Sequence, residues 1–156
     1  MVDYKSFPLE TITKFWFDEV RPPIGKALEE APEDKLDWSP ADDMITLGNI
    51  FMHIAEASDW WISEIIDNNG FKDYTPCPSV PKPDIAVMLD AHWKRLEDFF
   101  ARAPQVLEGV YDMSKYGRKK SVTGHWIFLH LLEHDIHHRS QINHYLRILG
   151  IKPPKI

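Results

Sequence analysis

The chain has 156 residues, of which 44% are hydrophobic and 27% are charged, the balance of a globular domain with one core. We therefore expect residues 1–156 to form a single domain. The formal net charge of −6 argues against nucleic acid or an anionic membrane as the main partner, because both select for basic surfaces.

The cellular location is predicted from what the sequence lacks. The first ten residues have neither the basic start nor the apolar core of a signal peptide, and no apolar stretch approaches the roughly 20 residues that span a bilayer. The single cysteine, Cys77, excludes an internal disulfide framework. We expect a cytoplasmic protein without membrane segments, and we interpret the basic run 118–120 as a solvated loop.

Proline removes a helical N–H and clashes with the preceding turn, so the gaps between prolines mark where long helices can form. Apolar residues at a spacing of three and four within these windows predict helices near 8–31, 44–68, 84–102 and 122–149. We expect a kink or break at Pro22-Pro23, an end of the last helix at Gly150, and a long connection over 104–121. Strand signals are nearly absent. Four amphipathic segments in one small domain predict an all-α fold, a four-helix bundle.

The stretch 130–144 holds five of the eight histidines, and they are not equivalent on a helical wheel. His134 and His138 fall within the apolar stripe, His137 and His144 lie on the polar side, and His130 is intermediate. Two inward imidazoles four residues apart can bind one first-row metal ion. The alternative is that both are hydrogen-bonded core residues.

A third metal ligand would have to come from another helix. His53 is the obvious candidate, because it lies on the flank of the apolar face of 44–68, from which a side chain points toward a neighbouring helix. It can equally be a boundary histidine packed on Trp60. His92 and His125 lie near the ends of their helices, and we interpret both as surface or capping residues.

Two polar residues are weak candidates for a catalytic role. Glu56, one turn beyond His53, could orient an imidazole or act as a base, or it could be a solvated carboxylate. Gln141 lies one turn from His138 and could donate to a metal ligand. Arg139 faces elsewhere and fits packing or an ion pair better than chemistry.

The segment HLLEH, residues 130–134, matches the H-x-x-E-H pattern of inverted zinc peptidases. We disfavour this interpretation because Glu133 projects away from the apolar stripe and only 22 residues remain for the further ligand that such enzymes need. A catalytic role for Cys77, in a proline-rich loop, is also disfavoured.

The C-terminal segment EHDIHHRSQINHYLRILG, residues 133–150, closely resembles the closing helix of the DinB/YfiT-like superfamily. The superfamily pattern runs roughly H-x-x-H-H-R-G-Q, and here Ser140 stands in place of the usual glycine. The segment DWSPADDMITLGNIFMHIAEASDWW, residues 37–61, resembles the tryptophan–proline loop and the helix that bears the first histidine of the family. The likeness covers nearly the whole chain in length and order of elements.

This resemblance implies a four-helix bundle with a long crossover connection, often paired as a homodimer, and it implies His53, His134 and His138 as metal ligands. Characterised relatives include transferases and isomerases that depend on low-molecular-weight thiols. We therefore expect a zinc or nickel ion and a small-molecule substrate, with transfer of a thiol to a small electrophile as the activity. The alternatives are a metal-dependent hydrolase and a metal-binding or structural bundle without turnover.

Overall fold

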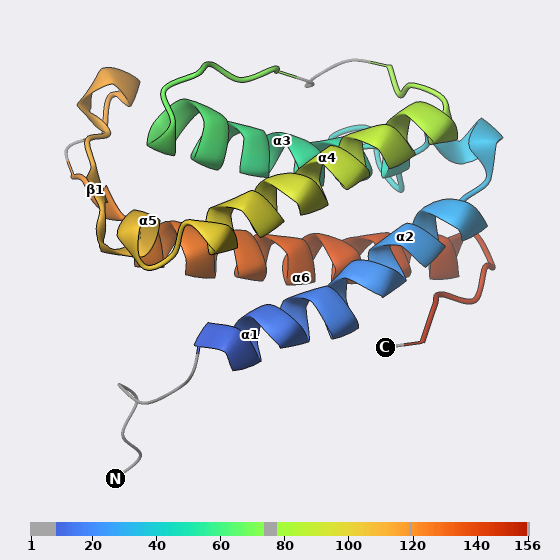
Figure 1. The fold of residues 1–156 in the computed structure, drawn as a ribbon. Helices are drawn as coiled ribbons and strands as arrows, with labels where there is room; N and C mark the ends of the chain where they lie inside the picture. Colours follow the sequence, from blue (N-terminus) through green and yellow to red (C-terminus); the bar gives the residue numbers. More distant parts are fainter. Residues whose placement is uncertain (1–8, 74–77, 119, 156) are drawn as a thin grey trace, which may run out of the picture.

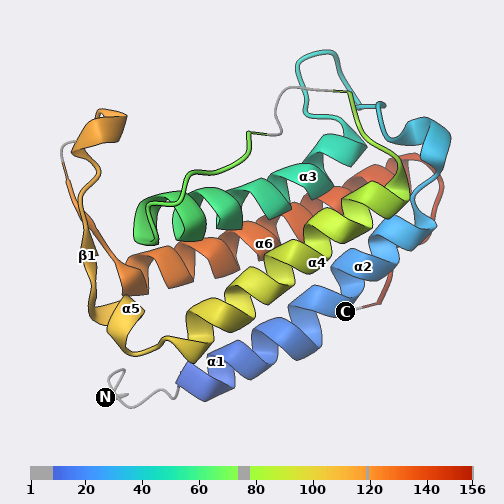
Figure 2. The same cartoon turned by 45° about the horizontal axis from the view of Figure 1, so that its top comes forward.

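In the computed structural model, which describes residues 9–73, 78–118 and 120–155, four long helical segments pack side by side (Figures 1 and 2). All four begin and end within a few residues of the predicted windows. The first contains α1, a π-helical stretch η2 and α2, and the second contains α3 and a π-helical stretch η4. Their bounds are α1 Leu9–Phe15, η2 Trp16–Val20, α2 Arg21–Glu30, α3 Leu47–Ser58, η4 Asp59–Ile66, α4 Lys82–Ala101 and α6 Gly124–Ile148.

The segment predicted as a connection holds additional structure. A short helix, α5 (Gln105–Glu108), precedes β1 (Val110–Tyr111), which pairs antiparallel with β2 (Val122–Thr123). Two 3-10 turns, η3 (Glu33–Lys35) and η5 (Ser114–Tyr116), complete the described elements. The fold is therefore mostly helical, as predicted, but it is more than four helices. Strands of two residues show no alternating pattern that sequence analysis could detect.

The break expected in the first helix is a widened turn just before the proline pair. Pro22 and Pro23 occupy the opening positions of α2, where a missing N–H costs least. In the preceding η2, the N–H of Arg21 donates to the carbonyl of Trp16, a longer span than in an α-helix. The helix axis thus continues through the prolines after a π-helical turn, which is a local adjustment rather than a chain reversal.

The directions of the helices follow from contacts between them. Arg95 on α4 donates to Ser58 at the end of α3, and Arg102 pairs with Asp67 just after η4, so α3 and α4 run in the same direction. Figure 1 shows the described parts of the connection between them leading from one end of this helix pair back toward the other. α6 runs opposite to α3, because Tyr145 near its end donates to the carbonyl of Ile45 at the start of α3.

Helix α6 is fixed at both ends. Thr123 caps its start by accepting a hydrogen bond from the N–H of Trp126, and Gly124 approaches the backbone of Val106 so closely that a Cβ atom would collide with it. The helix ends at Ile148, and Gly150 follows with a φ of +76°, the left-handed conformation that glycine adopts without strain. This end confirms the predicted boundary.

The core lies between the four long segments. Its largest fully buried side chains include Trp16, Phe51, Ile54, Leu96, Phe99 and Tyr145. Of the consecutive aromatic residues 15–17, Trp16 is fully buried, Phe17 packs edge-on against Phe100, and only Phe15 is largely exposed. Among the described residues, no helix is long and apolar enough to cross a membrane.

Candidate metal centre

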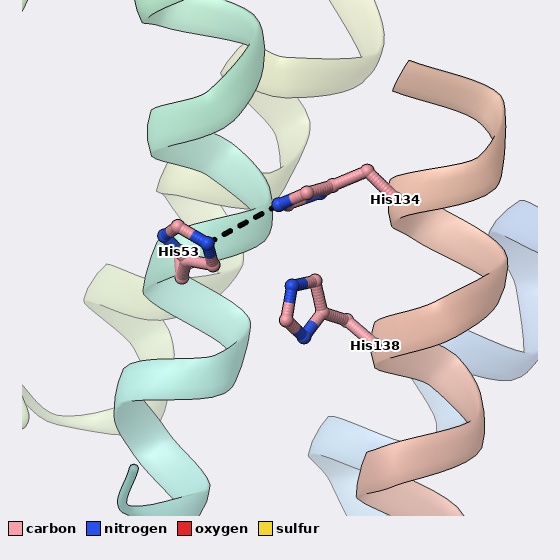
Figure 3. Close-up of side chains that lie close together, drawn as sticks. All are labelled: His53, His134 and His138. Atoms are coloured by element: carbon pink, nitrogen blue, oxygen red, sulfur yellow. Dashed lines mark hydrogen bonds between the residues drawn. The ribbon is translucent and has the colours of Figure 1, made fainter. Parts of the chain in front are cut away.

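Three partly buried histidines from two helices meet between α3 and α6. His53 reaches from α3 toward His134 and His138, which lie one turn apart on α6 (Figure 3). The Nε2 atoms of His53 and His134 are 3.2 Å apart, and each of the three residues offers one nitrogen within 4.8 Å of the other two. The structure therefore brings together the three residues that the sequence selected, and this cluster could hold a metal ion.

Two of the imidazoles are oriented by a side chain one turn further along the same helix. His53 Nδ1 lies 3.0 Å from Glu56 Oε2, and His138 Nδ1 lies 2.9 Å from Gln141 Oε1. Because both partners accept, each Nδ1 carries the proton and donates it, which leaves the Nε2 lone pair free. Glu56 and Gln141, the two weak catalytic candidates, are thus in position to orient the histidines.

The third imidazole faces a buried carboxylate at a longer distance. His134 Nδ1 lies 3.9 Å from Asp135 Oδ1, and neither atom has a hydrogen-bond partner among the described residues. With the Nδ1 proton of His53 directed to Glu56, the His53 Nε2 lone pair accepts from His134 Nε2–H. Binding of a metal ion at His134 Nε2 would require the imidazole proton to be on Nδ1 instead. Asp135 Oδ1 is the acceptor that this Nδ1–H would face.

The spacing and protonation of the cluster fit a first-row divalent ion. A tetrahedral ion with bonds of about 2.0–2.1 Å to nitrogen holds its ligand atoms about 3.3 Å apart, close to the His53–His134 separation. Burial, followed by the charge of His134, lowers the pKa of His138 to about 4. His138 is therefore neutral near pH 7, as a metal ligand must be.

A buried polar network lies directly behind His134. Asp135 Oδ2 accepts hydrogen bonds from Trp16 Nε1 at 2.8 Å and from His92 Nε2 at 3.0 Å, and both Asp135 and His92 are fully buried. Burial alone would raise the pKa of Asp135, but the charge of His92 and the hydrogen bonds to the carboxylate outweigh it and hold this pKa below its usual value.

The prediction that His92 is a surface or capping residue is wrong. The signal that places it in the core was present in the sequence, because the buried positions of α4 recur at three and four residues: Ile85, Leu89, His92, Leu96 and Phe99. A histidine on that stripe needs a buried partner, and Asp135 on α6 supplies it.

A pocket of about 380 Å³ opens beside the histidines. Its lining residues from α3 and η4 are His53, Glu56, Ala57, Trp60 and Trp61, and the rest are Phe71, Arg118, His130 and His134. The pocket combines aromatic walls, two of the three clustered histidines and the Arg118 guanidinium, which is the composition of a small-molecule site.

The remaining histidines of α6 are not members of the cluster, although two of their rings lie next to it: the centroid of His130 is 6.1 Å from that of His134, and the centroid of His137 is 4.9 Å from that of His138. His125, His137 and His144 are exposed, as predicted, and His130 stacks on Trp126 with ring centroids 4.8 Å apart.

The position of Glu133 excludes the inverted zinc peptidase pattern of residues 130–134. Glu133 is exposed and lines a separate surface pocket with Leu129 and His137, so it does not face the pocket that His130 and His134 line.

The remaining predictions concern residues that are not part of the histidine cluster. Arg139 is buried and donates to the carbonyl of Glu19, which is the packing role expected of it. Arg118 is exposed, consistent with the predicted loop, but it also contacts the pocket. Cys77 and Lys119 lie outside the described residues.

Comparison with known proteins agrees with this architecture. A model of the DinB family matches residues 12–156. The chain is similar in structure to a DinB-like protein from Bacillus subtilis, with 17% identity, a TM-score of 0.70, and 94% of this chain and 96% of that chain covered. It is also similar to a DinB-like protein from Bacillus cereus ATCC 10987, with 21% identity, a TM-score of 0.68, and 95% and 97% covered. A search of curated proteins finds no match.

Proposed function

Because the chain belongs to the DinB family and three of its histidines could hold a metal ion, we propose that it is a divalent-metal-dependent transferase. The proposed activity is transfer of a low-molecular-weight thiol to a small electrophile. The observation that carries it is the convergence of His53, His134 and His138 within 4.8 Å beside a pocket. The proposed framework is the four-helix bundle of the family, with the connection 67–81 as its long crossover.

Zinc or nickel is the proposed metal, because neutral imidazole suits both ions. An ion held by three imidazoles keeps an open position at which a thiol can bind as its thiolate near neutral pH. A reducing cytoplasm, which the single cysteine led us to expect, is where such thiols stay reduced.

The side chains around the histidines would hold the protons that the site needs. Glu56 and Gln141 keep the Nδ1–H of His53 and His138, so that both Nε2 atoms face the site. Asp135 would accept the Nδ1–H of His134. Each histidine thus has a partner on its own helix that selects the tautomer a metal requires.

The pocket would position the reacting molecules. Trp60, Trp61 and Phe71 offer apolar surface to a small organic substrate and displace water from it. In the proposed reaction, the S–H bond breaks and the thiol sulfur bonds to the electrophilic carbon. A leaving group departs from that carbon with its bonding electron pair, and the thiol proton passes through a base to solvent. Glu56 is the carboxylate that lines the pocket, and we propose it as the base that relays this proton to solvent.

Proton release on thiol binding tests this function. Protein purified without a histidine tag is loaded with Zn²⁺ and titrated with 2-mercaptoethanol by calorimetry, in buffers of different ionisation enthalpy. We expect binding with release of close to one proton, seen as a heat that varies linearly with buffer ionisation enthalpy. The His134→Ala variant serves as the control without a complete cluster.

Retained zinc without any thiol binding would overturn the transferase proposal. That outcome would favour a metal-dependent hydrolase, in which a bound water ionises near pH 7, or a metal-binding bundle without turnover. Hydrolysis of activated esters by the same zinc-loaded sample separates these two.

A further inference from the structure

Arg118 is a cation held against the aromatic wall of the pocket. Its guanidinium carbon lies 5.6 Å from the ring centroid of Trp60 and 5.7 Å from that of Trp61. The same residue lines the pocket that His53 and His134 also line. A guanidinium that rests on indole rings is kept in place while its N–H edges stay free to donate.

The charges that face this pocket are few. Among its described lining residues, Arg118 is the one with a permanent positive charge and Glu56 is the one carboxylate. Glu56 is buried and oriented toward His53, and no ion pair joins Arg118 to any acidic residue in the part of the chain that the structure describes. The guanidinium is therefore available to an external anion.

The distance between the histidines and Arg118 sets the size of a ligand that reaches both. Trp61 follows His53 by eight residues along α3 and η4, which corresponds to roughly 12 Å along the helix axis at about 1.5 Å per residue. A carboxylate attached directly to the carbon that bears sulfur is too short to span this gap. A chain of about five carbons between sulfur and the carboxylate extends over most of it.

We propose that Arg118 binds the anionic end of an elongated acidic thiol whose sulfur lies at the histidine cluster. The ligand class is a small thiol with a carboxylate or similar anion several bonds from sulfur, its apolar middle lying against Trp60 and Trp61. A planar guanidinium binds a carboxylate through paired hydrogen bonds, which gives both affinity and orientation. This inference rests on the proposed function and adds the charge and length of its substrate.

The test compares two probes of equal length on the zinc-loaded protein, 6-mercaptohexanoate and 6-mercapto-1-hexanol. We expect the acid to bind about fivefold to tenfold more tightly than the alcohol, and the preference to shrink at high ionic strength. In Arg118→Gln, the acid should bind no better than the alcohol, while the alcohol keeps its wild-type affinity and the zinc content is unchanged.

Lys120→Gln is the matched control, because it removes one positive charge from the same loop at a residue that lines a neighbouring pocket but not this one. The preference for the acid should survive in it. Equal affinities of the wild type for both probes, or equal loss of preference in both variants, would overturn the role of Arg118 and leave thiol binding standing. Failure of both probes to bind the zinc-loaded protein would instead overturn the proposed function and this inference together.

Discussion

His92 Nε2 donates a hydrogen bond to Asp135 Oδ2 over 3.0 Å, and neither side chain has exposed surface. Trp16 donates to the same oxygen, so one carboxylate joins the first helical segment, α4 and α6. Asp135 immediately follows His134 in α6. The network therefore fixes the stretch of backbone from which His134 projects, so Asp135 contributes both to stability and to the position of one histidine of the cluster.

Loss of His92 should strongly destabilise the protein. In His92→Leu the Asp135 carboxylate stays buried with a single donor, so we expect the free energy of unfolding to fall by about 3–5 kcal/mol. His125→Leu, at an exposed histidine, should change it by less than about 0.5 kcal/mol. Urea unfolding of both variants measures the difference, and similar values for the two would show that the buried pair contributes little.

Removal of the carboxylate behind His53 should weaken metal binding without abolishing it. Glu56→Gln replaces the charged acceptor of His53 Nδ1–H, so we expect the dissociation constant for zinc to rise about 10- to 100-fold. Competition with a chromophoric chelator measures this constant. Glu133→Gln removes an exposed carboxylate from α6 and should leave it unchanged. If both variants bind zinc as tightly as the wild type, Glu56 does not orient a ligand.

The metal-free protein should lose stability as the pH falls from about 6.5 to about 4. Burial lowers the pKa of His138 to about 4 in the folded protein, whereas the ordinary pKa of a histidine is 6.5. As the pH falls, this side chain is therefore protonated in the unfolded chain before it is protonated in the folded protein. The contribution of His138 to the free energy of unfolding is present in full above pH 6.5 and is lost as the pH approaches 4. Its upper limit is about 3 kcal/mol, at about 1.36 kcal/mol per unit of pKa.

Unfolding measured by denaturant at several pH values tests this linkage. His138→Gln should show a shallower fall in stability over this range than the wild type, whereas His144→Gln, at an exposed position, should follow the wild type. A wild-type stability that does not change between pH 6.5 and pH 4 would contradict the buried, neutral state of His138.

We propose that two copies of the chain form a homodimer through the outer face of α6. Leu129 is 56% exposed, and it forms an apolar stripe with the half-buried Leu132 and Ile136 at helical spacing. Light scattering at micromolar concentration should give twice the mass of one chain. Leu129→Glu should give a monomer, whereas Val87→Glu, on exposed surface of α4, should remain dimeric. A monomeric wild type would rule the dimer out.

The positions of the long helices and of the histidine cluster were predictable because each rests on a periodic pattern. Apolar spacing placed His134 and His138 inward, and the flank position of His53 aimed it at a neighbouring helix. The Nδ1 partners of two of the three imidazoles follow from the same geometry, since Glu56 and Gln141 lie three residues beyond His53 and His138.

Contacts between distant segments were not predictable from periodicity. The stacking of Arg118 on Trp60 joins residues 58 positions apart through an irregular loop that has no repeating pattern. The burial of His92 was readable from its stripe, but its partner Asp135 lies on another helix, and only the packing of α4 against α6 brings them together. The π-helical turns also have no sequence signature beyond the proline pair that follows η2.

Zinc stoichiometry after dialysis of untagged protein measures whether His53, His134 and His138 hold one divalent ion. We expect one zinc per chain in the wild type and in His137→Ala and His144→Ala, and a sharp loss of zinc in His53→Ala, His134→Ala and His138→Ala. Equal zinc retention in all five variants would contradict it.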